Sequence, residues 1–394
     1  MTKERRLTIR FVAVFLIAYM GYTIPYTLLI PFMTEAGYTP TQRGLILAGM
    51  SLVGIFGQFL FGFLCDRYRT VKKFYVATMV ALVVFCWLAY MTTANQFFYH
   101  FMTIAFTGGL FQIVVGLLDA WTLETDPYLV LHYGKIRAFG ALGWAIGSPM
   151  TAWIVSTMGY DKLGLANLIF TLLTLGISWN LRDAVKVHTN EGIKWKDVGQ
   201  LVRRKEYIVL VAILFFLNVV QAADMYTVID KILELGGSNA DVSLKWSFQA
   251  ITELPLFFLG AWLLVKFGGK RLLLFATTMY FVRFIGYAWA NSPFLLIAFS
   301  GFQMLTYPLI NVASKVLIAE ESPDQLRSTG LLFATSMSFS LSQLISPVFF
   351  GFLVEQFGST ITLTGIALGC LIPFALGLWY LTMKPLKKEI LTKA

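Results

Sequence analysis

Five ionisable side chains stand deep inside long apolar runs of the sequence. The acids are Asp119, Asp224 and Glu253, and the arginines are Arg137 and Arg283. An ionisable group in a lipid bilayer costs on the order of 3 kcal/mol even on a lenient insertion scale, so each of these needs a partner or a water-filled cavity. Such groups mark substrate pathways and proton relays in membrane proteins. We therefore predict that these residues form the functional site.

The balance of these charges favours proton chemistry. Three acids stand against two arginines, so one acid is left over if each arginine takes one carboxylate. A carboxyl group without a counter-ion in low-dielectric surroundings tends to stay protonated, as a proton carrier requires. We predict that one of Asp119, Asp224 and Glu253 carries a proton. An alternative is that Arg283 only ties two helices together through Glu253.

Amides and aromatic rings supply most of the other polar groups in the apolar runs. The amides are Gln58, Gln112, Asn218, Gln221, Gln249, Gln303, Asn311 and Gln343. Such a lining suits a neutral, hydroxyl-rich ligand better than an ion, and we predict that Gln249 and Gln303 contact it. The sequence shows no nucleophile with a base, and Cys65, Cys86 and Cys370 lack metal-binding spacing. We therefore expect no enzyme, no metal site and no cofactor.

The composition excludes a soluble globular protein of this size. Hydrophobic residues make up 57% of the 394 residues and charged residues 13%, and the mean hydropathy is +0.71. This leaves too little polar surface to cover a soluble fold. A bilayer core about 30 Å thick requires about 20 apolar residues per helix. We predict twelve membrane-spanning helices, at residues 8–33, 41–65, 73–93, 96–121, 133–157, 162–181, 206–233, 241–266, 270–290, 293–319, 327–354 and 359–382.

Basic residues gather in alternate loops, which predicts the orientation of the chain. The net charge of +10 could suggest nucleic acid, but the basic residues do not follow one soluble face. They fill the start of the chain, the segment 67–73 and the central segment 182–205, whereas the loops between carry few. Cytoplasmic loops of membrane proteins are rich in such residues. We therefore expect no nucleic-acid partner, but a multi-pass protein of the cell membrane with both termini cytoplasmic.

The chain reads as two copies of one half. The segment 62–73 has a divergent counterpart at 260–271, which is 198 positions later. A Ser-Pro pair at 148–149 recurs at the same spacing at 346–347. Parallel duplication of a six-helix half is a recurring plan of secondary transporters. Two repeats of this kind predict two related bundles.

The polar, basic segment in the middle of the chain is the predicted linker between these bundles. It spans 182–205, so the N-terminal bundle covers 1–181 and the C-terminal bundle covers 206–394. The predicted fold class is an all-α membrane protein whose twelve helices form two pseudo-symmetric six-helix bundles.

Two stretches resemble the major facilitator superfamily. The segment 62–73 is similar to its loop signature, although residues 68–71 interrupt the usual single glycine. The segment 133–145, with Asp119 upstream, resembles the oligosaccharide/proton symporters, the group of lactose permease. This resemblance implies that Asp119 and Arg137 bind sugar and that Trp144 stacks against the sugar ring.

The same resemblance assigns roles outside the sugar site. Arg283 falls on an arginine that acts in proton coupling in this group. We therefore predict that Glu253 and Arg283, supported by Asp224, couple transport to a cation. Asp66, Arg67, Lys72 and Lys73 belong to the loop signature. These four residues would stabilise one end state of the transport cycle through contacts between helices, which is a gating role.

The C-terminal half departs from the symporter pattern. Gln303 and Thr306 stand where this group has its coupling histidine and glutamate, and neither side chain carries a proton at neutral pH. The segment 339–342 contains no lysine where the group has one. Either Glu253 and Asp224 have taken over coupling, or the carrier runs without protons, or it exports its solute.

The sequence as a whole predicts a secondary active transporter. Its leading function is proton-coupled uptake of a sugar, an oligosaccharide or a glycoside by alternating access around a cavity between the bundles. The alternative is an exporter of a drug-like or small organic solute, with different cation coupling. The expected partners are a small-molecule substrate, protons and membrane lipid, and we expect a monomer.

Overall fold

The computed structural model describes residues 3–184, 195–323 and 326–384, and each secondary-structure element within these ranges is a helix. The chain forms two compact units. Unit 1 comprises Met1–His188 and Ile232–Leu254, and unit 2 comprises Thr189–Lys231 and Pro255–Ala394. The predicted division at 181 and 205 stays a prediction.

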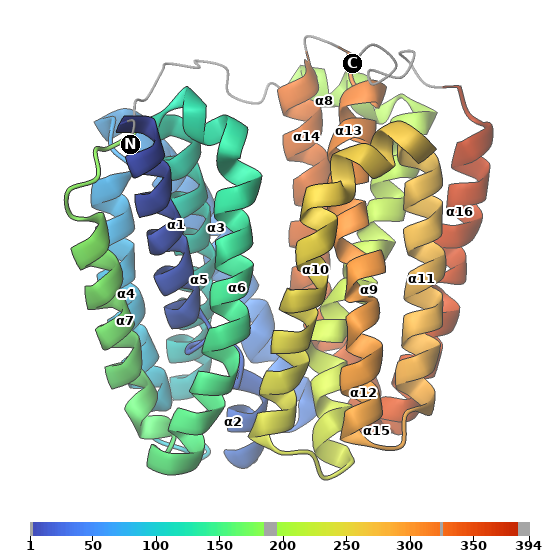
Figure 1. Cartoon of the computed structure of the whole chain (residues 1–394). Coiled ribbons are helices and arrows are strands. Elements are labelled where there is room, and N and C mark those ends of the chain that lie inside the picture. Colours follow the sequence, from blue (N-terminus) through green and yellow to red (C-terminus); the bar gives the residue numbers. More distant parts are fainter. Residues whose placement is uncertain (1–2, 185–194, 324–325, 385–394) are drawn as a thin grey trace. The chain divides into compact units, whose positions relative to one another are not determined.

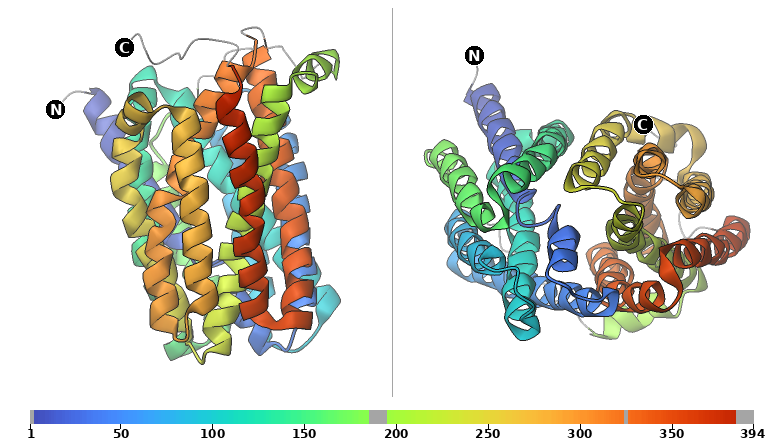
Figure 2. Two further views of the ribbon diagram at one scale, coloured as in Figure 1. Left: turned by 90° about the vertical axis from the view of Figure 1, so that its right-hand side faces the viewer. Right: turned by 90° about the horizontal axis from the view of Figure 1, so that it is seen from below.

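Unit 1 is built from long helices that run side by side (Figures 1 and 2). α5 packs against α3 and α4, and α1 packs against α6 and α7. The start of α1 and the end of α7 lie at the same end of the unit (Figure 1). The elements are α1 (Lys3–Tyr22), α2 (Leu29–Glu35), α3 (Pro40–Tyr68), α4 (Lys72–Tyr90), α5 (Phe97–Thr125), α6 (Pro127–Met158), the 3-10 helix η1 (Tyr160–Lys162) and α7 (Leu163–Ser178).

A tight turn between α5 and α6 brings two predicted site residues to one end of unit 1. The Asp126 carboxylate accepts a hydrogen bond from the Tyr128 amide at 2.9 Å and so caps α6, and Pro127 fits the first helical turn. At 1.5 Å per residue, Asp119 stands about 10 Å before this turn and Arg137 about 16 Å after it. The two side chains therefore belong to neighbouring parts of adjacent helices.

Glycines let α6 approach α1 very closely. A Cβ atom added at Gly147 would lie 2.7 Å from the Met20 carbonyl oxygen, and one at Gly143 would overlap the Leu16 carbonyl. Residues with a side chain would force the helices apart, because the obstacle is backbone. This contact holds the Trp144 side of α6 against α1.

The first predicted span, 8–33, is interrupted. α1 ends at Tyr22 and α2 begins at Leu29, with hydrogen-bonded turns between them. Pro25 explains the break, since it has no N–H to donate and its ring clashes with the carbonyl one turn earlier. Tyr26 consequently lies in a non-helical segment.

Unit 2 is organised around α11, which packs against α13, α15 and α16. Figure 2 shows α11 and α16 side by side. The elements from α8 onward are α8 (Trp195–Val202), α9 (Lys205–Glu234), α10 (Asn239–Phe267), α11 (Gly269–Trp289), α12 (Pro293–Ser300), the 3-10 helix η2 (Gly301–Leu305), α13 (Tyr307–Glu321), α14 (Arg327–Thr335), the π-helix η4 (Ser336–Ser340), α15 (Leu341–Gly369) and α16 (Leu371–Thr382). By the division above, the end of α9 and the first half of α10 belong to unit 1.

Several expected elements of unit 2 are less regular than the sequence predicts. The predicted span 293–319 is interrupted by η2, and the span 327–354 contains the π-helix η4. At Gly358 the backbone of α15 leaves the helical conformation with φ of 77°, where the sequence predicts the loop between the last two spans. The predicted linker contains the short helix α8.

The helix lengths agree with a membrane protein. In the described parts of the chain, nine helical stretches are long and apolar enough to cross a bilayer. One of them, Thr329–Thr382, contains the turn at Gly358 and therefore corresponds to the last two predicted spans. The predicted spans 8–33 and 241–266 are not among the nine, and the first is broken at Pro25 and starts with several arginines.

The repeat in the sequence has a structural counterpart. The Lys72 ammonium donates to two carbonyl oxygens beyond the end of α7, at 2.6 and 2.7 Å. Lys270, 198 positions later, donates to two carbonyl oxygens at the end of α16, at 3.1 and 2.8 Å. Pro149 and Pro347 are also 198 positions apart, and both lie inside a helix, α6 and α15 respectively. The two bundles are thus pseudo-symmetric, as predicted.

Candidate substrate and coupling sites

Asp119 and Arg137 lie in one cluster with two tyrosines of unit 1. The guanidinium carbon of Arg137 lies 4.5 Å from the centre of the Tyr19 ring, within the range of a cation–π contact. The Tyr133 hydroxyl hydrogen-bonds the Asp119 carboxylate. Tyr133 precedes Arg137 by one turn of α6, so the acid and the arginine reach the same cluster from α5 and α6. A carboxylate that accepts and a guanidinium that donates can together hold the hydroxyl groups of a solute.

Four aromatic rings form a second cluster in unit 1, centred on Trp144. The Trp144 ring centre lies 5.8 Å from that of Tyr26 and 6.0 Å from that of Phe111. The Trp246 ring lies 6.3 Å from Trp144 and 6.1 Å from Tyr26. Trp144 follows Arg137 by two turns of α6. The cluster offers large, rigid apolar faces near a polar pair, an arrangement that fits a ligand with both kinds of surface.

The first half of α10 contributes three candidate residues to unit 1. Trp246, Gln249 and Glu253 are spaced by three and four positions, so they share one helix face. Gln249 is buried and Glu253 is half-buried. The Ser247 hydroxyl donates to the Ala145 carbonyl oxygen and ties this part of α10 to α6. The structure therefore groups Glu253 with the unit that holds Asp119 and Arg137.

Arg283 forms a buried charge network with Asp224 in unit 2. Arg283 Nη2 lies 2.6 Å from Asp224 Oδ1, and both side chains are fully buried. The Tyr287 hydroxyl donates to the same carboxylate oxygen at 2.8 Å and accepts from Arg283 Nε at 2.9 Å. The carboxylate that Arg283 binds within unit 2 is that of Asp224. The pairing of Arg283 with Glu253 stays a prediction. The predicted coupling residues are thus divided between the two units.

Gln303 completes the network from the irregular part of the tenth span. Arg283 Nη1 donates to the Gln303 side-chain oxygen and lies 3.4 Å from the Thr306 hydroxyl oxygen. The 3-10 turn of η2 places Gln303 and Thr306 three residues apart on one side, since this helix has three residues per turn. Because the Gln303 amide and the Thr306 hydroxyl are neutral, they add no charge to the pair of Asp224 and Arg283. Contact between Gln303 and substrate stays a prediction.

The predicted gating residues lie at the end of α3 and the start of α4. Asp66, Arg67 and Lys73 are exposed. Lys72 is half-buried, and its ammonium binds the carbonyl oxygens of Trp179 and Leu181 after α7. A cation suits this place because the end of a helix carries unsatisfied carbonyl groups and partial negative charge.

Asp183 provides the reciprocal contact from the segment after α7. One carboxylate oxygen accepts from the Thr70 hydroxyl at 2.5 Å, and the other accepts from the Val71 and Lys72 amides at 3.0 and 2.9 Å. Partial burial alone would raise the pKa of Asp183, but these hydrogen bonds and one from the Ala184 amide outweigh it and lower the pKa. The carboxylate therefore caps α4 while Lys72 caps α7.

Comparison with known proteins identifies the chain's family. Residues 7–364 match the model of the MFS_1 like family. The chain belongs to this family of the major facilitator superfamily. It is a membrane transporter rather than an enzyme, as predicted.

Relatives of this transporter have different solutes in their names. It is 23% identical over 344 residues to raffinose permease of Escherichia coli, covering 82% of this chain and 80% of the relative. It is 24% identical over 363 residues to the probable 3-phenylpropionic acid transporter of Escherichia coli strain K12, covering 87% of this chain and 91% of that relative. A point mutant of the nucleoside transporter NupG has a TM-score of 0.80 at 15% identity, covering 95% of this chain and 99% of that one. The structural match confirms the fold class.

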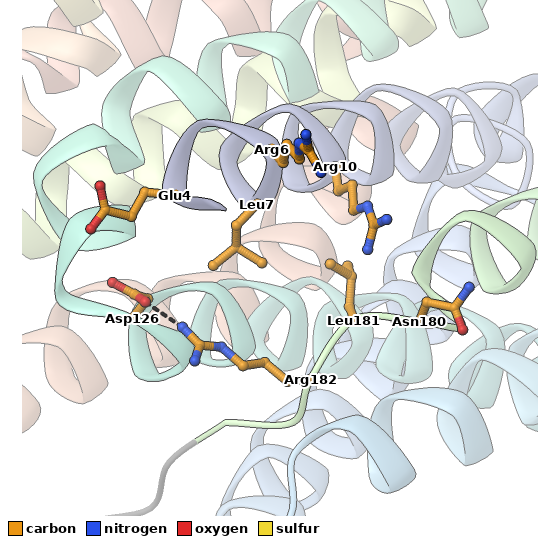
Figure 3. A pocket seen from close by; sticks show the side chains of 8 residues that line it. All are labelled: Glu4, Arg6, Leu7, Arg10, Asp126, Asn180, Leu181 and Arg182. Atoms are coloured by element: carbon orange, nitrogen blue, oxygen red, sulfur yellow. Dashed lines mark hydrogen bonds and ion pairs between the residues drawn. The ribbon is translucent and has the colours of Figure 1, made fainter. Parts of the chain in front are cut away.

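A charged cavity of about 610 Å³ lies at the end of unit 1 where α1 begins (Figure 3). Arg182 forms an ion pair with Asp126, and Arg10 extends toward Leu181 and Asn180 (Figure 3). None of the predicted substrate-binding or coupling residues of the transporter lines this cavity. It therefore belongs to the basic end of the bundle and not to the candidate site.

Sequence reasoning missed five aromatic residues that complete these clusters: Tyr19, Tyr26, Phe111, Trp246 and Tyr287. Helical spacing was the signal that could have found three of them. Phe111 stands about two turns before Asp119 on α5, Trp246 stands two turns before Glu253 on α10, and Tyr287 stands one turn after Arg283 on α11. No comparable signal marks Tyr26, because it lies in the break between α1 and α2.

Proposed function

We propose that this transporter takes up a sugar, an oligosaccharide or a glycoside together with protons, by alternating access. The observation that carries the proposal is the pairing of Asp119 and Arg137 with the aromatic cluster around Trp144, all within unit 1. Carboxylate and guanidinium groups supply acceptors and donors for hydroxyls, and the indole supplies an apolar face. The sugar permeases among the relatives support the same substrate class.

Protons are the proposed coupling ion, and Glu253 is the proposed proton carrier. Asp224 is engaged by Arg283 and Tyr287, whereas Glu253 shares a face of α10 with Trp246 and Gln249. Protonation at this position would therefore be close to the proposed sugar site in the same unit. We further propose that the protein acts as a monomer in the cell membrane with both termini in the cytoplasm, as the distribution of basic residues indicates.

Export of a small organic solute is the second candidate function. It is favoured by Gln303 and Thr306, since amide and hydroxyl groups in the Arg283 network offer no titrating acid beyond Asp224. The relative whose name contains 3-phenylpropionic acid also shows that sugars are not the only solutes named among similar proteins. Trp144 distinguishes the two functions, because an adaptable apolar site depends less on one ring than a sugar-stacking site does.

Uptake into proteoliposomes tests the proposal. We expect a labelled sugar from a panel of mono- and oligosaccharides to accumulate only with an inward proton gradient. Trp144→Ala should reduce this uptake at least tenfold, because it removes the central ring of the cluster. Trp153→Ala is the matched control, since Trp153 lies on the same helix and is 58% exposed. If no sugar enters with or without the proton gradient, the uptake proposal is wrong and export becomes the leading function.

A further inference from the structure

Trp246, on the first half of α10, carries a buried hydrogen-bond donor with no acceptor among the described residues. Only 8% of this residue is exposed, and its Nε1–H donates to no atom in the described ranges. Trp121 is also buried, but its Nε1–H donates to the Arg182 carbonyl oxygen at 2.9 Å. An indole N–H can only donate, and leaving a buried donor unpaired costs free energy. The Trp246 N–H therefore calls for an acceptor that the described part of the chain does not supply.

The charged neighbour of this indole cannot be the acceptor. The Lys245 ammonium lies 4.0 Å from the centre of the Trp246 ring, in a cation–π contact, and Lys245 is fully buried. An ammonium group donates hydrogen bonds and accepts none. Because Lys245 lies over the face of the ring, the N–H at the edge of the indole is the part left for a polar contact.

The same indole borders the aromatic cluster around Trp144. Its ring centre lies 6.3 Å from that of Trp144 and 6.1 Å from that of Tyr26, with the ring planes inclined by 73° and 65°. The Ser247 hydroxyl donates to the Ala145 carbonyl oxygen, so a hydrogen bond between the next residues of the two helices holds both tryptophans in place. All of these residues belong to unit 1. Trp246 is thus held beside the proposed sugar site.

The aromatic cluster has an accessible side. Trp144, Tyr26 and Phe111 are only partly buried, in contrast with Trp246. A sugar that stacks on the accessible part of the Trp144 ring would bring its hydroxyl groups close to the neighbouring indole. A hydroxyl oxygen can accept a hydrogen bond from an N–H. The sugar itself can therefore supply the missing acceptor.

Stacking and hydrogen bonding contribute differently to specificity. A ring face binds an apolar sugar face with little dependence on the position of any one hydroxyl. A buried donor does depend on it, because an analogue without the matching hydroxyl leaves the donor unpaired. Sites that hydrogen-bond a substrate hydroxyl therefore strongly reject the analogue that lacks it. Trp144 is suited to holding the sugar ring, and Trp246 is suited to recognising one hydroxyl.

We infer that Trp246 is a specificity-determining residue of the sugar site, and that its Nε1–H donates to one hydroxyl oxygen of the bound sugar. The inference rests on the proposed function and deepens it, because it adds recognition of a single hydroxyl position to the stacking on Trp144. A water molecule is the competing acceptor. It would satisfy the same N–H without any dependence on the sugar.

Binding of deoxy sugars to the purified full-length protein tests this inference. The probes are glucose, galactose and the four monodeoxy forms of each, which lack the hydroxyl at carbon 2, 3, 4 or 6. We expect the parent protein to bind one deoxy form at least tenfold more weakly than the complete sugar. Trp246→Phe removes the N–H and keeps an aromatic ring. It should bind the complete sugar about tenfold more weakly and no longer distinguish that deoxy form, as a double-mutant cycle between the N–H and the hydroxyl requires.

Trp121→Phe is the matched control, since it removes a buried indole N–H that already has an acceptor in the protein. It should lower the thermal unfolding temperature but leave the order of affinities among the deoxy sugars unchanged. If Trp246→Phe does not fold, the indole N–H resonance of Trp246 in the parent protein provides a second measurement. The complete sugar should shift this resonance more than the weakly bound deoxy form does, and equal shifts would contradict the inference.

The outcomes separate this inference from the proposed function. Equal weakening of every probe by Trp246→Phe would assign Trp246 to packing, and unchanged binding would assign its N–H to water, so either result overturns the inference. A parent protein that binds neither glucose nor galactose would overturn it as well. Proton-driven uptake of another sugar would still support the proposed function in each case. Conversely, a Trp246-dependent preference without proton-driven uptake would retain the inference and reject proton coupling.

Discussion

At the scale of single residues, the pair of Arg283 and Asp224 makes the sharpest stability prediction. Both side chains are fully buried, so removing one leaves an uncompensated charge in a low-dielectric site. We expect Asp224→Asn to lower the free energy of unfolding by about 3–5 kcal/mol. The double variant Asp224→Leu with Arg283→Leu should lose less, because it removes both charges. Thermal unfolding of the purified variants measures this.

The comparison between those two variants decides the role of the pair. If Asp224→Asn is as stable as the parent protein, the ion pair does not stabilise unit 2. If the double variant is stable but transports nothing, the pair acts in transport beyond its structural role. The sequence could predict that these charges need partners, because the cost of burial follows from residue type. It could not predict which acid pairs with Arg283, since Asp224 and Glu253 are both far from it along the chain.

At the scale of helices, Asp183 is predicted to stabilise the contact between α4 and α7 in a pH-dependent way. Its pKa is lowered in the folded protein, so its contribution is present above the ordinary carboxyl pKa of about 3.9 and is lost as pH falls through the lower folded value. We expect Asp183→Asn to reduce the unfolding temperature by several degrees at pH 7. The difference from the parent protein should shrink as the pH falls below the ordinary carboxyl pKa of about 3.9 and vanish below the lowered pKa of the folded protein.

The control for this prediction is Asp161→Asn, which removes an exposed acid from unit 1 at the other end of α7. It should change the unfolding temperature by less than Asp183→Asn does. A pH-independent difference for Asp183→Asn would mean that its effect comes from packing and not from the charged cap. The same experiment on Lys72→Met should also lower stability, because the carbonyl oxygens after α7 lose their donor.

Helix positions were largely predictable from the sequence, but their interruptions were not. Apolar runs of about 20 residues fix where a bilayer can be crossed, and the runs near 41–65 and 73–93 correspond to α3 and α4. Hydropathy responds to composition and not to backbone hydrogen bonding. It therefore gave no sign of the 3-10 turn η2 or the π-helix η4. Pro25 is an exception, because a proline that can interrupt a helix is visible in the sequence. The position of Tyr26 in the resulting break still depended on the fold.

At the scale of the whole molecule, transport and its coupling to protons are predicted to be separable. Each unit contains its own capped helix ends, with Lys72 in one and Lys270 in the other. Substrate binding and proton binding are proposed for unit 1, at Asp119 and Glu253. The conformational cycle of an alternating-access carrier requires both units, whereas the coupling ion requires only its own site.

Glu253→Gln should therefore abolish accumulation but leave exchange. A glutamine keeps the size and hydrogen-bonding capacity of the side chain but carries no titrating proton. We expect proteoliposomes with this variant to exchange labelled for unlabelled substrate at a rate within about threefold of the parent protein, while accumulation driven by a proton gradient is lost. Glu35→Gln, an exposed acid of α2, should change neither. Loss of both activities would place Glu253 in substrate binding or folding, and retention of both would exclude it as the proton carrier.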